Sequence, residues 1–404
     1  MAILYITYDG LTDPLGGSQI IPYLKGISSH QKNIVVLSFE KSERLKYVYK
    51  STIKVMESDS IKWYPLHFTK DFGIVGKSWD LVRMYIMAFF LTYKYKVKIV
   101  HARGHPSAQV AYFIKQLLGA KLLFDFRGLW VDERVDKGGW DLSRFSHNFQ
   151  YNFFKRLEKK ILSKSDHVVV LTDEVVDEVV KLGVSDVSKV TTIPCCADFD
   201  HFFLSSDTLK IKAKAMVNIS KKSFVIGYLG SVGNMYLLDR FLYFFKIVAK
   251  IRSDCCVFLI THDVSKLKAL VKSNLPDSLH DSVYIKSANR DEVPLLISAM
   301  DLMVSFILPS YARMAASPTK IAECFAAGEP VIANDGVGDI AKIVNKLDGG
   351  KIVNPFSDED LMKVSHELDK IVAKGGYRLR EVSRPMLGLE LANKRYKSVY
   401  EKLI

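Results

Sequence analysis

The sequence predicts an α/β protein of two doubly wound domains that face each other across a cleft. Short apolar runs typical of buried parallel strands alternate with helical patterns over residues 1–202, and the alternation begins again at residue 223. The 404 residues suffice for about two to three domains. We therefore assign 1–202 to an N-terminal domain, 203–222 to a linker, 223–385 to a C-terminal domain and 386–404 to a helix packing back on the N-terminal domain.

Composition and charge narrow the class of protein and of partner. With 49% hydrophobic and 25% charged residues, the chain is typical of globular proteins. Its net charge of +13 favours an anionic partner, such as nucleic acid, an anionic membrane or a phosphorylated small molecule. The five cysteines lack the C-x-x-C spacing of a zinc or redox site, so no metal site is predicted, and their strand-like surroundings indicate buried thiols in a reducing compartment. No signal peptide is expected, and the apolar window Met84–Leu91 is too short to span a bilayer, so we expect a cytoplasmic protein.

The N-terminal half contains seven predicted strands and two clear predicted helices. Each strand is an apolar run bounded by turn residues, as expected for a buried parallel sheet. The strands are expected at 2–8, 33–39, 62–68, 98–101, 121–126, 167–172 and 190–194, and the helices at 107–118 and 151–163.

Paired glycines follow the first strand. Gly16 and Gly17 come just before a helix expected to begin near Ser18, where they would let backbone N–H groups approach a phosphate or a sugar. A plain strand-to-helix turn explains the same two residues, and the sequence leaves both interpretations open.

The range Lys41–Lys98 is strongly basic, with twelve Lys and Arg residues against five acidic ones. Aromatic and aliphatic residues are interleaved with the lysines, including the apolar run Leu81–Leu91. Such a surface suits an anionic membrane, where each cation contributes about 1 kcal/mol. A solvated face over a buried helix is the alternative for Leu81–Leu91. No recognised nucleic-acid-binding module accompanies the charge, so nucleic acid is not predicted as a partner.

A polar cluster follows the strand at 121–126. The sequence DFRGLWVDE places Asp125, Arg127, Trp130 and Glu133 at the carboxyl end of this strand. Ligands of open parallel sheets bind outside the carboxyl ends of strands, which predicts a substrate pocket here. The alternative is a structural Asp–Arg pair.

The C-terminal half repeats the alternation. Strands are expected at 223–229, 257–261, 283–286, 302–306 and 330–333, with helices beginning near 294 and 317 and a final amphipathic helix at 387–403. The glycines near Gly230 do not match G-x-G-x-x-G in register, and no acidic residue ends the following strand near 258–260. A dinucleotide-binding site is therefore not predicted.

The segment Ser317–Asn334 predicts an anion site. Ser317 is expected to cap a helix with Pro318 at its first position, and Thr319 and Lys320 fall in the first turn. Free N–H groups, the positive end of the helix dipole and a lysine together attract a phosphate. One turn further, Glu323 can accept hydrogen bonds from vicinal hydroxyls, a combination that suits a nucleotide-sugar. An ordinary capped helix with a solvated Glu323 is the alternative.

Several of these motifs together resemble the GT-B glycosyltransferases of family four, the glycosyl transferases group 1. The strongest is PTKIAECFAAGEPVI at 318–332, and the others are Gly16-Gly17, Ile193-Pro194 with Asp198 and Phe202, and Gly230-Ser231. The resemblance covers essentially the whole chain in order, and it implies two Rossmann-like domains.

The resemblance implies a retaining glycosyltransferase that uses a nucleotide-diphosphate-sugar donor, without cofactor or metal. We expect a glycan or a lipid-linked acceptor in the synthesis of a bacterial surface polysaccharide such as lipopolysaccharide. The basic range Lys41–Lys98 argues for such an acceptor and for peripheral attachment to the inner face of the plasma membrane. The implied donor-binding residues are Gly16, Gly17, Gly230, Ser231, Arg290, Arg313, Ser317, Pro318, Thr319, Lys320 and Glu323. We assign catalysis to Asp125, Arg127 and Lys320, and acceptor contacts to His101, Arg103, Trp130 and Glu133.

One departure from the family's pattern concerns the E-x7-E pair. Its first glutamate, which normally contacts the transferred sugar, is Ala315 in this chain. The sequence therefore leaves the donor sugar open. It also keeps two other functions open, a nucleotide-sugar epimerase on the same fold and a catalytically silent partner subunit.

Overall fold

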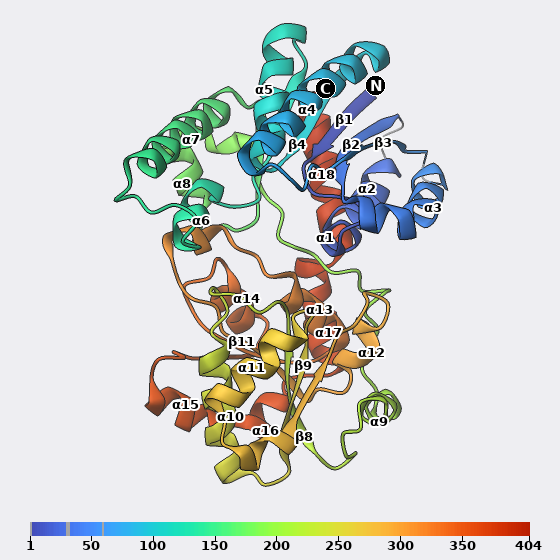
Figure 1. Ribbon diagram of the computed structural model, residues 1–404. Coiled ribbons are helices and arrows are strands. Elements are labelled where there is room, and N and C mark those ends of the chain that lie inside the picture. The colour runs from blue at the N-terminus through green and yellow to red at the C-terminus, as the bar shows by residue number, and fades with distance from the viewer. Residues whose placement is uncertain (1, 30–32, 59) are drawn as a thin grey trace. The chain divides into compact units, whose positions relative to one another are not determined.

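The structure, a computed structural model, describes residues 2–29, 33–58 and 60–404. The chain folds into two compact units, and a parallel sheet with covering helices forms each of them (Figure 1). Unit 1 comprises Met1–Pro194 with Leu389–Ile404, and unit 2 comprises Cys195–Gly388. The predicted fold class of two doubly wound α/β domains is confirmed.

The sheet of unit 1 has seven parallel strands in the order β3-β2-β1-β4-β5-β6-β7. The direction of winding reverses between β1 and β4, and such a switch point is where open sheets bind ligands. The strands are β1 (Ala2–Thr7), β2 (Ile34–Glu40), β3 (Lys62–His67), β4 (Val97–Arg103), β5 (Lys121–Asp125), β6 (His167–Val170) and β7 (Val190–Thr192). All seven agree with the predicted strands to within a few residues.

The helices of unit 1 cover its sheet. They are α1 (Pro14–Gln19), α2 (Ile21–Ser28), α3 (Ser42–Ser58), α4 (Gly73–Tyr95), α5 (Gly104–Leu118), α6 (Trp130–Asp136), α7 (Phe145–Lys164), α8 (Val176–Lys181), the 3₁₀ turn η1 (Val187–Lys189) and α18 (Leu389–Leu403). The C-terminal α18, red in Figure 1, packs against α2 within unit 1. Two of its tyrosines, Tyr396 and Tyr400, are fully buried there.

The sheet of unit 2 has six parallel strands in the order β10-β9-β8-β11-β12-β13. They are β8 (Phe224–Leu229), β9 (Cys255–Ile260), β10 (Val283–Lys286), β11 (Leu302–Ser305), β12 (Val331–Ala333) and β13 (Gly350–Ile352). The strand β13 was not predicted, because its three residues Gly-Lys-Ile show no apolar run. Here the switch point lies between β8 and β11.

Helices and 3₁₀ turns cover the sheet of unit 2 as well (Figure 1). The full set is α9 (Asp207–Met216), α10 (Leu238–Ile251), α11 (Val264–Asn274), η2 (Asp277–Ser282), α12 (Val293–Ile297), η3 (Tyr311–Ala315), α13 (Thr319–Ala327), α14 (Ile340–Lys346), α15 (Asp358–Ser365), α16 (Leu368–Val372) and α17 (Tyr377–Leu387).

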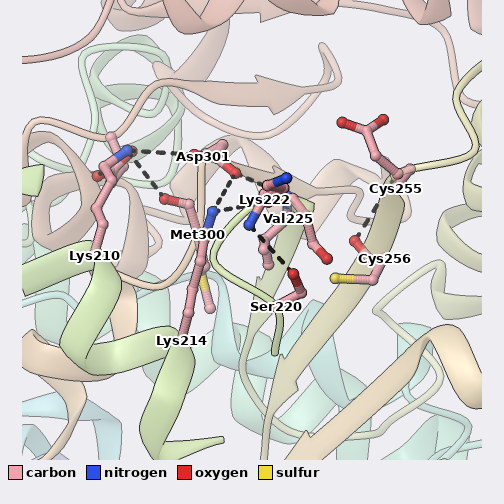
Figure 2. Close-up of polar contacts among 12 residues, drawn as sticks. Lys210, Lys214, Ser220, Lys222, Val225, Cys255, Cys256, Met300 and Asp301 are labelled. Atoms are coloured by element: carbon pink, nitrogen blue, oxygen red, sulfur yellow. Dashed lines mark hydrogen bonds and ion pairs between the residues drawn. The ribbon is translucent and has the colours of Figure 1, made fainter. Parts of the chain in front are cut away.

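The linker predicted at 203–222 is instead part of unit 2, because it contains α9, and two lysines of α9 contact the residues that directly precede β8 and β11 (Figure 2). Lys214 Nζ donates to the Ser223 carbonyl at 2.8 Å and pairs with Asp301 at 3.3 Å. Lys210 Nζ lies 3.6 Å from the same carboxylate, which also accepts the Val225 N–H at 2.8 Å. The division of the chain thus falls after Pro194 and after Gly388. In the sequence these lysines look like ordinary solvated residues, so the boundary was misplaced.

The described residues contain no helix that combines the length and the apolarity needed to cross a membrane. The apolar window Met84–Leu91 lies inside the 23-residue α4.

Candidate functional site

The clearest candidate site lies in unit 2, where the loop after β8 meets the first turn of α13. Gly230 directly follows β8 and adopts φ +150°, a conformation that L side chains rarely adopt. A Cβ added there would lie 2.9 Å from Lys320 Nζ and 3.2 Å from the Tyr228 hydroxyl. The glycine therefore leaves room for the lysine head beside the backbone.

Lys320 is buried and lacks a hydrogen-bond partner for its ammonium. The residue is 9% exposed, and no polar atom of the described residues accepts a hydrogen bond from Nζ. Nζ instead lies 4.4 Å from the ring centroid of Tyr236 and 4.9 Å from that of Tyr228. Burial lowers the pKa of Lys320 to about 8. A buried cation without an acceptor is costly, and an anionic ligand at this position would relieve the cost.

Glu323 lies one turn along α13 from Lys320 and is paired with Arg290. Arg290 Nη1 donates to Glu323 Oε1 at 3.1 Å, and the guanidinium lies 5.3 Å from the ring centroid of Phe202. Burial raises the pKa of Glu323, while the Arg290 charge opposes this rise. The structure thus brings Arg290 and Glu323 together. One oxygen of the Glu323 carboxylate thus accepts a hydrogen bond from Arg290, a pairing that the sequence did not predict.

The start of α13 differs from the prediction. The helix begins at Thr319 with Pro318 as its N-cap residue, and no side chain caps it. The Ser317 hydroxyl accepts the Cys195 N–H at 3.0 Å, so the predicted N-cap role of Ser317 is wrong. The sequence pattern missed this partner because Cys195 lies 122 residues away. The first turn therefore keeps the uncapped end of the helix dipole next to Lys320.

Ser231 and Arg313 are the other predicted donor residues of unit 2. Ser231 is exposed, and its carbonyl accepts the Tyr228 hydroxyl at 2.7 Å. Arg313 and Ala315 are both buried in η3, so the position of the family's first motif glutamate holds a buried methyl group. The two tyrosines beside Lys320 were not predicted, because neither belongs to a recognisable pattern in the sequence.

Gly16 and Gly17 do not lie in the loop before a helix, as predicted, but inside α1. A Cβ added to Gly16 would lie 2.3 Å from the carbonyl oxygens of Gly10 and Leu11. A glycine is thus needed at position 16 because the backbone of residues 10 and 11 of the same chain lies close to it. The Glu40 carboxylate holds the same loop by accepting the N–H groups of Leu11 and Thr12 at 2.8 and 3.0 Å.

Gly16→Ala is expected to lower the free energy of unfolding by about 1–3 kcal/mol, because two backbone carbonyls must move. Gly233→Ala, where an added Cβ meets nothing within 4 Å, is the matched control and should change it by less than about 0.5 kcal/mol. Urea denaturation measures both. A Gly16→Ala protein of full stability that has lost nucleotide binding would instead support the predicted ligand contact.

In unit 1, the predicted residues His101, Arg103, Asp125 and Arg127 form one buried cluster. Asp125 is 1% exposed and lies 3.6 Å from His101, 3.7 Å from Arg103 and 3.5 Å from Arg127. Burial alone would raise the pKa of Asp125, but Arg127, His101 and Arg103 together hold it well below its usual range. Burial lowers the pKa of His101. The cluster keeps a carboxylate ionised inside the unit.

Three further side chains complete this cluster. The Tyr396 hydroxyl donates to Asp125 at 3.2 Å, Tyr400 is hydrogen-bonded to His101 Nδ1 at 2.7 Å, and Gln19 accepts from Arg127 and Arg103 at 2.8 and 3.2 Å. Both tyrosines come from α18, about 270 to 300 residues after their partners. This geometry favours the structural Asp–Arg interpretation of the DFRGLWVDE motif, and the catalytic role of Asp125 and Arg127 stays a prediction.

Trp130 and Glu133, predicted to bind the acceptor, lie in α6. Trp130 packs in an aromatic cluster, stacked on His105 at 5.6 Å and edge-on to Trp140 at 6.0 Å. Glu133 pairs with Lys137 at 2.8 Å, one helical turn away. Both residues are half-buried, and their acceptor contacts stay a prediction.

Comparison with known proteins gives two consecutive family matches. Residues 63–196 match the model of the Glycosyl transferase 4-like domain, and residues 224–368 match that of the Glycosyl transferases group 1. The second match contains Gly230, Arg290, Lys320 and Glu323. No curated protein matches the chain in sequence.

Solved structures are similar to the chain over its whole length. HepE of Anabaena in complex with UDP-glucose shares 13% identity and a TM-score of 0.71, with 100% of this chain and 99% of that chain covered. Sucrose-phosphate synthase from Thermosynechococcus elongatus shares 15% identity and a TM-score of 0.74 over 100% and 99% of the two chains. WaaG, a glycosyltransferase involved in lipopolysaccharide biosynthesis, shares 14% identity and a TM-score of 0.66 over 98% and 99%. At these identities the likeness shows the fold.

Proposed function

Because the chain belongs to the glycosyl transferases group 1 family, with a glycosyl transferase 4-like domain preceding that domain, we propose that it transfers a sugar from a nucleotide-diphosphate-sugar to a glycan or lipid-linked acceptor. We further propose that the anomeric configuration is retained and that the product belongs to a surface polysaccharide. HepE has been solved with UDP and with UDP-glucose, which supports a nucleotide-sugar donor by analogy of fold. WaaG is involved in lipopolysaccharide biosynthesis, which supports a surface polysaccharide as the product.

The observation that carries the proposal is the buried ammonium of Lys320 without an acceptor. It lies in the first turn of a helix that no side chain caps, next to a glycine whose missing Cβ opens the space. A diphosphate would supply the missing acceptors and meet the positive end of the helix dipole. We assign the ribose hydroxyls to Glu323, with Arg290 fixing the orientation of its carboxylate.

Breaking the bond between sugar and diphosphate leaves negative charge on the departing phosphate. Lys320 and the first-turn N–H groups of α13 would stabilise that charge, and a preorganised charged donor of this kind contributes about 3–4 kcal/mol. In this proposal no group of the enzyme attacks the sugar. The acceptor hydroxyl approaches from the side of the leaving group, and no metal is needed.

A thermal-shift screen with UDP, GDP, ADP and CMP tests the donor site. One nucleotide at about 100 times its Kd should stabilise the protein by about 2.7 kcal/mol, or roughly 5–10 °C for a unit of this size. Lys320→Ala and Glu323→Ala should lose the shift, while Lys346→Ala, which removes an exposed lysine of unit 2, should keep it. A protein that no nucleotide stabilises would favour the silent partner subunit. Turnover of the donor without an acceptor would favour the epimerase.

The affinity for the nucleotide should fall as the pH rises above about 8. The free protein loses the Lys320 proton near that pH, and only the ammonium form binds the diphosphate. The linkage of one proton predicts a decrease approaching tenfold per pH unit, measured as Kd by titration calorimetry between pH 7 and 10. Glu323→Ala should bind the nucleotide more weakly but show the same change of Kd with pH, because Lys320 is still present. If Kd changed equally with pH in Lys320→Ala, the assignment to Lys320 would be contradicted.

A further inference from the structure

The outer face of α4 in unit 1 is apolar and exposed, whereas the alternative kept open for Leu81–Leu91 was a solvated face over a buried helix. Seven residues along this helix are exposed to solvent and share one side at helical spacing: Val75, Trp79, Val82, Ile86, Phe89, Phe90 and Tyr93. We call these residues the α4 stripe. Val75 is 72% exposed, Ile86 60% and Tyr93 76%. The opposite side of the helix is buried through Met84, Ala88 and Leu91, so the helix presents apolar side chains in both directions.

The α4 stripe is long and free of acidic side chains. From Val75 to Tyr93 it runs for about 27 Å along the helix axis. Asp80 is the only acidic residue between Phe72 and Lys96, and it is buried and held by Tyr8, Thr69 and Arg83. A contiguous apolar patch of this kind marks an interaction surface. In Figure 1 α4 runs along the outside of unit 1 beside α5, and Phe113 of α5, itself exposed, packs edge-on against Tyr85.

A basic hollow lies at the C-terminal end of the α4 stripe. It has a volume of about 420 Å³, and four lysines line it: Lys62, Lys94, Lys96 and Lys98. The Lys94 ammonium lies 5.6 Å from the ring centroid of Phe90, so the charges directly adjoin the apolar residues. Acidic residues are absent from the described residues that line the hollow. The surface therefore combines an apolar face with a concentrated positive charge.

We propose that the α4 stripe and the basic hollow form a docking surface for an anionic lipid bilayer. An amphipathic helix lying in the plane of an interface buries its apolar side chains below the headgroups, while flanking lysines contact lipid phosphates. Trp79 and Tyr93, near the two ends of the stripe, are the residue types that settle at the level of the headgroups. A second copy of the chain fits less well as the partner. In a symmetric dimer the two basic hollows would lie close together, and their like charges would repel each other in a protein of net charge +13.

This proposal rests on unit 1 alone and does not depend on the nucleotide-sugar site. Of the basic range 41–98, which was predicted to contact an anionic membrane, the proposal uses only residues of α4, β3 and the start of β4. Within that range Tyr47, Val48, Ser58 and Asp59 lie outside the described side chains and carry no part of the argument.

Co-sedimentation with vesicles, without any nucleotide, tests the proposal. The wild type should bind vesicles of phosphatidylcholine mixed with phosphatidylglycerol, and binding should weaken with added salt and be much weaker on phosphatidylcholine alone. Ile86→Glu should reduce the partition coefficient for the vesicles at least about tenfold, since the aliphatic side chain that enters the bilayer in the bound state is replaced by a carboxylate. Ile211→Glu, at a similarly exposed isoleucine of unit 2, is the matched control and should bind as the wild type.

The lysines are tested separately from the apolar stripe. Lys96→Gln with Lys98→Gln should weaken binding about fivefold per lysine. Lys221→Gln with Lys222→Gln, two exposed lysines of unit 2, removes the same charge and should have little effect. Insertion of the stripe should also shift the fluorescence of Trp79 to shorter wavelength, a shift that Trp79→Phe abolishes.

Three outcomes would overturn the proposal. The first is that the wild type fails to bind anionic vesicles, and the second is that Ile86→Glu, folded by circular dichroism, binds them as well as the wild type does. The third is a dimer, measured by light scattering, that Ile86→Glu dissociates, since the α4 stripe would then be covered by a second copy.

Discussion

Lys320→Met should lower kcat/KM about 10²–10³-fold and at the same time make the free protein more stable. The loss of rate corresponds to about 3–4 kcal/mol of stabilisation of the departing diphosphate. The gain in stability follows from burial, because methionine fills the space without a charge that lacks an acceptor. A residue that costs stability and is needed for activity is the signature expected of a functional site.

The size of the stability gain depends on pH, with a sign that can be worked out. The pKa of Lys320 is about 8 in the folded protein, below its ordinary value of 10.5. Below pH 8 the ammonium is charged in both states, so the folded state carries the full cost, up to about 3 kcal/mol. Between pH 8 and 10.5 the folded state is neutral while the unfolded state still binds the proton, so the stability of the wild type rises toward that of Lys320→Met.

Urea denaturation at pH 7 and pH 10 measures the stability, and release of nucleotide from the nucleotide-sugar chosen by the binding screen measures the rate. Lys346→Met is the control for removal of an exposed lysine and should change neither quantity. If Lys320→Met destabilised the protein at pH 7, the ammonium would have acceptors in the free state, and the argument for an anion site would fail.

Asp125→Ala should destabilise the protein by about 3–5 kcal/mol. It leaves the buried Arg103 and the neighbouring Arg127 without the carboxylate that balances their charge, and it takes an acceptor from Tyr396. Since the pKa of Asp125 is held below its usual range in the folded state, its contribution is present above the unfolded pKa of about 4 and is lost as the pH falls below it. Thermal and urea unfolding at neutral and acidic pH measure the effect.

Two further variants separate the structural role of Asp125 from a catalytic one. Asp177→Ala removes an exposed carboxylate of unit 1 and should have little effect on stability. Asp125→Asn keeps the shape of the side chain and removes its charge. Full activity in a folded Asp125→Asn protein would exclude Asp125 from catalysis, while a large loss of rate at unchanged stability would support the catalytic prediction.

The sequence by itself determined the strands other than β13, the helices α5, α7, α12, α13 and α18, and the positions of Lys320 and Glu323 in the candidate donor site. Buried parallel strands are continuous apolar runs, so β1 and β8 can be read from a few consecutive residues. Lys320 and Glu323 can also be placed from a short stretch of sequence, because a local pattern of proline, polar residues and a closing glycine predicts the first turns of α13.

Only the tertiary structure decided which partners these side chains have. Ser317 accepts a distant backbone N–H and does not cap α13, Glu323 pairs with Arg290, and Asp125 contacts residues of β4 and α18. It also decided that two lysines of α9 pair with Asp301, directly before β11, and that the outer face of α4 is apolar. The physical reason is that periodicity records which side chains are apolar, whereas burial and charge pairing depend on elements that are close in space and far apart in sequence.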